Sequence, residues 1–378
     1  MKPHKLLVRL KDDFLCVQLG ITRRENVKLA KNRNNLVELA RFIFSMLVVG
    51  YHIQMTWGGT GAHFFAGGAL AVEFFFLVSG FFMAKSIEKT FDLDNQSIAG
   101  NTKRFIWNKI KGILPVHIVA IILMILVVVL TRRDEAGSLI AQGIPGMFLI
   151  QMAAVWDGSY QQALIVPEWY LSSMLLMMLI MFPMGTWLRK RMKGPAVVSL
   201  LLVFMLVILL LVKMVVTGGL PENLQQDLRA WGEMCVGMFA CYFSAYLSKA
   251  NLKSGVQKLL PVLEVILYSI PVILGMIPLT SDAKVVTMVA SVVCVFGAIS
   301  ITFSCKGLQI RNPELNGFFG VLGSFSLPIY LFHPVLISLF EYLPVQLPLW
   351  GWHLVIWLLA IGSAVLYHLI SRRRSSAS

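Results

Sequence analysis

Charged residues are scarce in this sequence. Only 14% of its 378 residues are Asp, Glu, Lys or Arg, whereas a soluble domain carries about a quarter. Hydrophobic residues make up 57% of the chain, and many lie in uninterrupted runs. A run of about 20 such residues forms a helix that crosses the ~30 Å hydrocarbon layer of a bilayer. The composition excludes a soluble globular protein and predicts an all-α integral membrane protein.

Cysteine is also rare. The five cysteines form no CxxC pair and have no metal-ligand spacing. Four of them lie in or beside apolar runs, where a free cysteine behaves as a small hydrophobic residue. We therefore expect no disulfide and no metal site. The five are Cys16, Cys235, Cys241, Cys294 and Cys305.

Apolar runs of spanning length predict a bundle of about ten transmembrane helices. They lie at residues 36–56, 67–86, 112–130, 166–188, 195–216, 229–247, 259–279, 283–304, 319–340 and 349–370. The stretch 140–156 is short and broken by glycine and proline, so we expect an interfacial or re-entrant piece there. The runs divide the chain into a basic extension (1–35), a transmembrane domain (36–370) and a short basic tail (371–378).

The positive residues predict the orientation. With the N-terminus in the cytoplasm, 27 of the 33 Lys and Arg residues fall in inner segments and four at the outer side. Such an excess is typical of cytoplasmic loops, so both termini are predicted to be cytoplasmic in a plasma membrane protein. Residues 1–35 contain no early apolar core, which predicts that the first span is an uncleaved anchor. The net charge of +14 then reflects topology and contact with membrane lipid rather than nucleic acid binding.

Two ionisable residues, Arg41 and His52, lie within the first predicted span. Eleven steps of ~100° bring both side chains to one face of a helix, ~16 Å apart along its axis. The predicted orientation places Arg41 near the cytoplasmic end and His52 toward the outer side. Ionisable groups are costly inside a bilayer, so each one predicts either a partner or a function.

Other polar residues share the predicted outer depth of His52. They are Glu73, Glu168, Arg229, Glu233, Tyr330 and His333. A histidine that a carboxylate orients is suited to general base catalysis, so His52 with Glu73 or Glu168 is a candidate for deprotonating a hydroxyl that attacks a thioester. A structural hydrogen bond between helices and a proton relay in a transporter are the alternatives. His117, in the third span, is predicted to be a hydrogen-bonded core histidine.

Five sequence blocks, taken together and in order, resemble the membrane-bound acyltransferase-3 family. Arg41 and His52, separated by ten residues, are similar to its arginine–histidine signature. Glu73 before three phenylalanines and Ser-Gly-Phe is similar to its second-helix block. The other blocks are Pro167–Leu171, Arg229 followed by Gly237, and Ser326–His333. The resemblance covers residues 36–370.

The resemblance implies an O-acyltransferase, most often one that uses acetyl-CoA and acylates sugar hydroxyls of an exported polysaccharide. The acceptor is then a glycan or a lipid-linked saccharide. The implied catalytic residues are His52, Glu73 and Glu168. Donor-binding residues are expected to be Arg41, Arg104, Lys109 and Lys111. Residues that shape the site are expected to be Trp169, Tyr170, Arg229, Tyr330 and His333.

The sequence departs from the family where many members have arginines before a proline in the third span. Lysines stand there instead, in the stretch Lys109–Pro115. Lysine attracts phosphate as a point charge without the bidentate fork of arginine. The oligomeric state is open, with a homodimer as one option. Rival functions are a proton-coupled secondary transporter and an inactive scaffold of a polysaccharide export complex.

Overall fold

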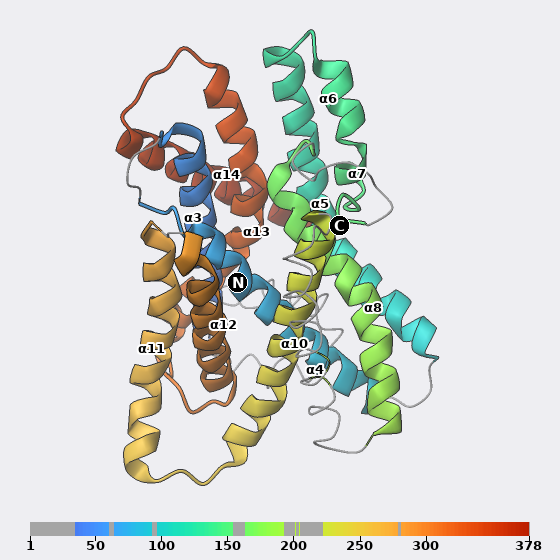
Figure 1. The fold of residues 1–378 in the computed structure, drawn as a ribbon, viewed down its shortest axis with the longest axis vertical. Coiled ribbons are helices and arrows are strands. Elements are labelled where there is room, and N and C mark those ends of the chain that lie inside the picture. Colours follow the sequence, from blue (N-terminus) through green and yellow to red (C-terminus); the bar gives the residue numbers. More distant parts are fainter. Residues whose placement is uncertain are drawn as a thin grey trace.

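The computed structural model describes residues 35–59, 64–92, 97–153, 163–192, 201, 204, 222–278 and 281–377, and these residues contain helices and no strands (Figure 1). The prediction of an all-α protein is confirmed. The long helices are α3 (Leu36–Trp57), α4 (Ala71–Asp92), α5 (Ile98–Thr131), α8 (Trp169–Arg191), α10 (Glu222–Lys249), α11 (Ser254–Met276), α12 (Ser281–Phe303), α13 (Pro313–Tyr342) and α14 (Leu349–Ala377).

Eight helices within the described residues are long and apolar enough to cross a membrane: α3, α4, α5, α8, α11, α12, α13 and α14. Helix α10 is also long, but it carries the charged Asp227, Arg229 and Glu233 in its first half. The span predicted at 195–216 lies outside the described residues apart from residues 201 and 204. Eight of the ten predicted spans therefore coincide with helices of spanning length and composition.

Two helices extend beyond the predicted spans. Helix α5 begins at Ile98, well before the span predicted at 112–130, and Ser97 caps its N-terminus by accepting a hydrogen bond from the Gly100 amide. It then continues through Pro115, which transmembrane helices tolerate. Helix α14 continues to Ala377, so most of the basic tail predicted at 371–378 is helical.

The stretch predicted to be re-entrant forms only short helices. These are α6 (Ala136–Gln142) and α7 (Ile144–Met147). A four-residue helix is ~6 Å long and cannot cross a bilayer. The prediction that residues 140–156 contain no full span is confirmed for residues 140–153, which the structure describes.

Two glycines bring α4 and α10 into close contact. A Cβ atom on Gly80 would lie 2.0 Å from the Met234 carbonyl oxygen, and one on Gly237 would lie 2.0 Å from the Leu77 carbonyl oxygen, both far inside van der Waals contact. Any side chain at either position would therefore force the helices apart. Small residues allow such close approach in membranes, where van der Waals contact drives association. This crossing fixes how Glu73 of α4 and Arg229 of α10 face each other.

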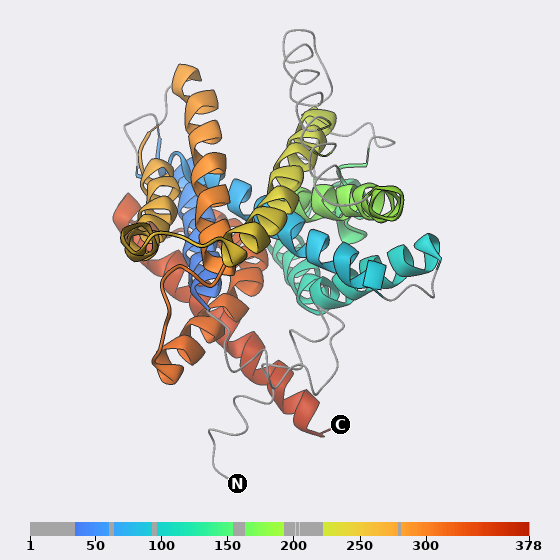
Figure 2. The same ribbon diagram turned by 90° about the horizontal axis from the view of Figure 1, so that it is seen from below.

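The helices lie in two groups on either side of α4 and α10. Figure 1 shows α11 and α12 on one side and α5 and α8 on the other, and the view from below in Figure 2 shows the same division. Helix α3 contacts α11, and α13 contacts both α3 and α5. Helices α3 and α13 therefore connect the two groups. The space between α3, α4, α5, α8 and α13 contains the cavity described next.

Candidate active site

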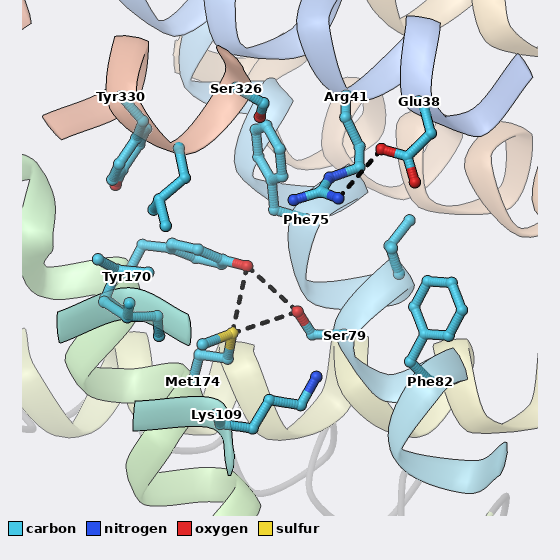
Figure 3. A pocket seen from close by; sticks show the side chains of 14 residues that line it. Glu38, Arg41, Phe75, Ser79, Phe82, Lys109, Tyr170, Met174, Ser326 and Tyr330 are labelled. Carbon is cyan, nitrogen blue, oxygen red and sulfur yellow. Dashed lines mark hydrogen bonds and ion pairs between the residues drawn. The ribbon is translucent and has the colours of Figure 1, made fainter. Parts of the chain in front are cut away.

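A cavity of about 120 Å³ lies between five helices (Figure 3). Each of α3, α4, α5, α8 and α13 contributes side chains to it, so the whole centre of the bundle is needed to form it. Its wall combines charged, hydroxyl and aromatic groups. The lining residues are Glu38, Arg41, Phe75, Val78, Ser79, Phe82, Lys109, Ile113, Tyr170, Leu171, Met174, Ser326, Leu327 and Tyr330.

Three charged residues from two helices line this cavity. Arg41 Nη1 donates a hydrogen bond of 3.2 Å to Glu38 Oε2, and Lys109 enters from α5 (Figure 3). Two cations and one carboxylate leave the lining with a positive excess, which favours an anionic group. Arg41 and Lys109 were predicted as donor-binding residues, but Glu38 was not. Its spacing of three residues from Arg41 on one helix was the signal that the prediction missed.

The other two predicted donor-binding cations do not line the cavity. Arg104 and Lys111 are exposed on α5, and the Lys111 ammonium lies 5.2 Å from the centre of the Trp107 ring. Helix geometry explains the separation, because Lys111 is ~200° around α5 from Lys109, whereas Arg104 and Lys111 share a face. Their contact with a donor stays a prediction.

Hydroxyl groups form a second part of the cavity wall. The Ser79 and Tyr170 hydroxyls lie 3.2 Å apart, and both donate to Met174 Sδ, at 3.2 and 3.5 Å (Figure 3). Tyr330 donates to the Pro167 carbonyl. Two of the predicted site-shaping residues, Tyr170 and Tyr330, therefore line the cavity, whereas Trp169 packs against Phe76 outside it.

Each helix that lines the cavity, or the turn directly before it, also carries an ionisable side chain outside the lining. These side chains all lie on one side of the cavity. On α3, α5 and α13 these residues follow the cavity residues in sequence, and on the oppositely directed α4 and α8 they precede them. The five together form a polar layer over one end of the cavity. They are His52, Glu73, His117, Glu168 and His333.

Two histidines from different helices meet in this layer. His333 Nε2 lies 3.3 Å from His52 Nδ1, and the two ring centres are 5.0 Å apart. His52 is partly buried, whereas His333 is completely buried. Tyr330, which lines the cavity, has its ring centre 6.0 Å from that of His333. The histidine pair is thus adjacent to the cavity wall.

The hydrogen bonds of the pair define the protonation of each ring. His52 Nδ1 lies 2.9 Å from the Val48 carbonyl oxygen, and His333 Nδ1 lies 3.1 Å from the Ile329 carbonyl oxygen. A carbonyl oxygen only accepts, so each Nδ1 must carry the proton and donate it. Both neutral rings then have a lone pair on Nε2. In His52 this leaves Nε2 as the basic atom.

Among the described residues, His52 is not paired with Glu73 or Glu168, the two carboxylates expected to orient it. Glu168 Oε1 instead accepts a hydrogen bond of 2.7 Å from His117 Nδ1. His117 Nε2 donates to the Met147 carbonyl at 3.1 Å, and both His117 and Glu168 are buried. His117 is therefore a hydrogen-bonded core histidine, as predicted, and it connects α5 to α7 and to the short 3-10 helix Val166–Glu168 that precedes α8. The catalytic role of Glu168 stays a prediction.

Glu73 is paired with Arg229. The Arg229 Nη2 group donates to Glu73 Oε1, its Nε donates to Glu233 Oε1 at 2.9 Å, and its Nη1 donates to Gln226 Oε1 at 3.3 Å. Glu73 is completely buried. Depth along a helix placed these groups at one level, but the close contact of α4 and α10 decided that Glu73 faces Arg229. The catalytic role of Glu73 also stays a prediction.

Among the described residues, eight helices have the length and composition to span a membrane, and five of them line one cavity. These features define a multi-pass membrane protein. The family model described as an acyltransferase domain matches residues 34–372, so the chain belongs to the acyltransferase-3 family. Comparisons with curated proteins and with solved structures gave no match. The protein is therefore a membrane acyltransferase, as the resemblance of the five sequence blocks indicated.

Proposed function

We propose that this acyltransferase moves an acetyl group from cytoplasmic acetyl-CoA to a hydroxyl of an extracytoplasmic glycan or lipid-linked saccharide. The observation that carries the proposal is one continuous set of contacts. Arg41 and Lys109 line the same cavity as Tyr330, Tyr330 contacts His333, and His333 contacts His52. An anion-attracting cavity thus adjoins the histidine pair that contains the proposed base.

The orientation in the membrane follows from the charge distribution. Cytoplasmic loops attract Lys and Arg, so we place both termini in the cytoplasm of a plasma membrane protein. The charged nucleotide end of the donor then stays at the inner face, because phosphates are costly to bury at mid-membrane. Its narrow arm enters the cavity past Arg41 and Lys109 toward His52. The ~16 Å between residues 41 and 52 suits this arrangement.

The reaction uses His52 Nε2 first as a base and then as an acid. Nε2 takes the proton of the acceptor hydroxyl while the acceptor oxygen attacks the thioester carbonyl carbon. The carbon–sulfur bond then breaks, and the departing sulfur receives the proton from Nε2. An acyl-histidine intermediate on the same nitrogen is the second route. Either way the products are the acetyl ester and free CoA.

Transfer of label tests the proposal directly. Membranes that contain the protein are incubated with acetyl-CoA labelled in the acetyl group and with candidate cell-surface glycans, and label in the glycan is measured. We expect incorporation that depends on the protein and on the acceptor. Transport of label without ester formation would favour a transporter, and the absence of both would favour a scaffold.

Two neighbouring lysines of α5 provide a matched test of the donor site. Lys109→Ala is expected to raise the KM for acetyl-CoA about 10- to 100-fold, since a hydrogen bond to a charged group contributes about 1.5–3 kcal/mol. Lys111→Ala, on the exposed face of the same helix, is expected to leave KM within about twofold of wild type. An equal rise in KM in both variants would show that the donor does not bind on the face of α5 that lines the cavity.

A further inference from the structure

We propose that His333 is a positioning residue that supplies a neutral hydrogen-bond acceptor to His52. It occupies the place where the sequence predicted a carboxylate. The inference rests on the proposed function, in which His52 Nε2 is the base, and adds the partner that fixes which nitrogen of His52 is free. The atoms concerned are His333 Nε2 and His52 Nδ1, 3.3 Å apart.

The backbone fixes the acceptor state of His333. Its Nδ1 donates to the carbonyl of Ile329, four residues earlier on α13, so the lone pair of the neutral ring must lie on Nε2. His52 repeats this arrangement on α3, with its Nδ1 near the carbonyl of Val48, also four residues earlier. The His52 Nδ1 proton thus has two acceptors, one from its own helix and one from α13. Together they hold the ring with Nε2 facing away from both.

The carboxylates of this layer are engaged elsewhere. Glu168 accepts from His117, and Glu73 accepts from Arg229. A carboxylate beside His52 would favour the charged imidazolium, which cannot act as a base. A neutral imidazole orients His52 with much less bias toward that form. When Nε2 takes the acceptor proton, the hydrogen bond from His52 Nδ1 to His333 Nε2 becomes charge-assisted and strengthens.

His117, another buried histidine of this layer, has the hydrogen bonds expected of a structural residue. His117 has both nitrogens engaged, with the Glu168 carboxylate and with the Met147 carbonyl, and it is completely buried. No nitrogen of His117 is left for a substrate. His52 is only partly buried, and its described hydrogen bonds use Nδ1 alone. The structure therefore separates a reactive histidine from a structural one by their partners.

A pair of substitutions of equal length tests the proposal. Gln and Met are similar in size, but only Gln offers an acceptor oxygen near the position of His333 Nε2. His333→Gln is expected to keep kcat within about tenfold of wild type, and His333→Met to lower it by about 10²-fold or more. The KM for acetyl-CoA is expected to change less than about twofold in both, because orientation of a base acts on the chemical step. His368→Gln, on α14, is the control that leaves activity unchanged.

The outcomes separate this inference from the proposed function. If His52→Ala is inactive while His333→Met keeps kcat within about threefold of wild type, the role of His333 is overturned and the proposed function stands. If His52→Ala is fully active, the proposed function fails. Equal loss in His333→Gln and His333→Met would also overturn the acceptor role. Should neither variant fold, ¹⁵N NMR of histidine-labelled wild-type protein decides: His52 protonated at Nδ1 supports the inference, and protonation at Nε2 alone overturns it.

Discussion

Replacing His52 with alanine is expected to lower acyl transfer by about 10²- to 10⁴-fold, the range that a general acid–base group contributes. The partner hydrogen bonds leave Nε2 of His52 as the basic nitrogen of a pair that adjoins the cavity wall. Alanine removes the base but keeps a good helix former in α3. The measurement is the initial rate of label transfer from acetyl-CoA to the acceptor in membranes with equal amounts of protein.

The control for this experiment is a histidine that the proposed chemistry does not use. His353 lies in the first turns of α14, where it packs against the Phe65 and Trp357 rings. His353→Ala is expected to keep most of the transfer rate, although it removes a buried ring. A His52→Ala protein that inserts normally and transfers at a rate within tenfold of wild type would contradict the assignment of the base.

Replacing Arg229 with leucine is expected to cause the largest loss of stability. Arg229 is hydrogen-bonded to two carboxylates, Glu73 and Glu233, and both are buried. Removing the guanidinium leaves them without their cation. Breaking a buried ion pair from one side costs about 3–5 kcal/mol, because the remaining charge is uncompensated. The measurement is the midpoint of thermal unfolding of the protein in detergent.

A triple variant distinguishes charge from shape at this position. Arg229→Gln combined with Glu73→Gln and Glu233→Gln removes the cation together with both of its carboxylates and keeps side chains that can hydrogen-bond. We expect it to recover most of the stability that Arg229→Leu loses, since neutral replacement of a buried pair is often close to neutral in free energy. An unfolding midpoint for Arg229→Leu equal to that of wild type would show that the cluster does not hold α4 and α10 together.

Depth in the membrane was the part of the site that could be predicted from sequence. A helix rises ~1.5 Å per residue, so the position of Arg41 or His52 along its span follows from the boundaries of the run. In the structure, His52, Glu73, Glu168 and His333 lie beyond the cavity-lining residues on one side of the cavity, and their depth in a membrane stays a prediction. The partners within that layer could not be predicted, because each depends on how two helices are rotated toward each other.

Two pairs of residues show this limit. Lys109 and Lys111 are two positions apart and were given one role, yet Lys109 lines the cavity and Lys111 lies on the exposed face. Glu73 or Glu168 was expected to orient His52, but Glu168 contacts His117 and Glu73 contacts Arg229. Neighbouring helix positions differ by ~100°, so the residues of a short stretch lie on several faces of the helix. Which of them line a site depends on the helices that pack against each face.

The sequence by itself determined that the chain is an all-α membrane protein, where eight of its spans lie, and to which family it belongs. These properties depend on local features of the sequence, namely the length of the apolar runs and short motifs of nearby residues. Only the tertiary structure decided that His333 is the partner of His52, that Glu73 belongs to Arg229, and that Arg41 and Lys109 share one cavity. The reason is physical: contacts between helices are set by close packing, as at Gly80 and Gly237, and that packing involves residues far apart in the sequence.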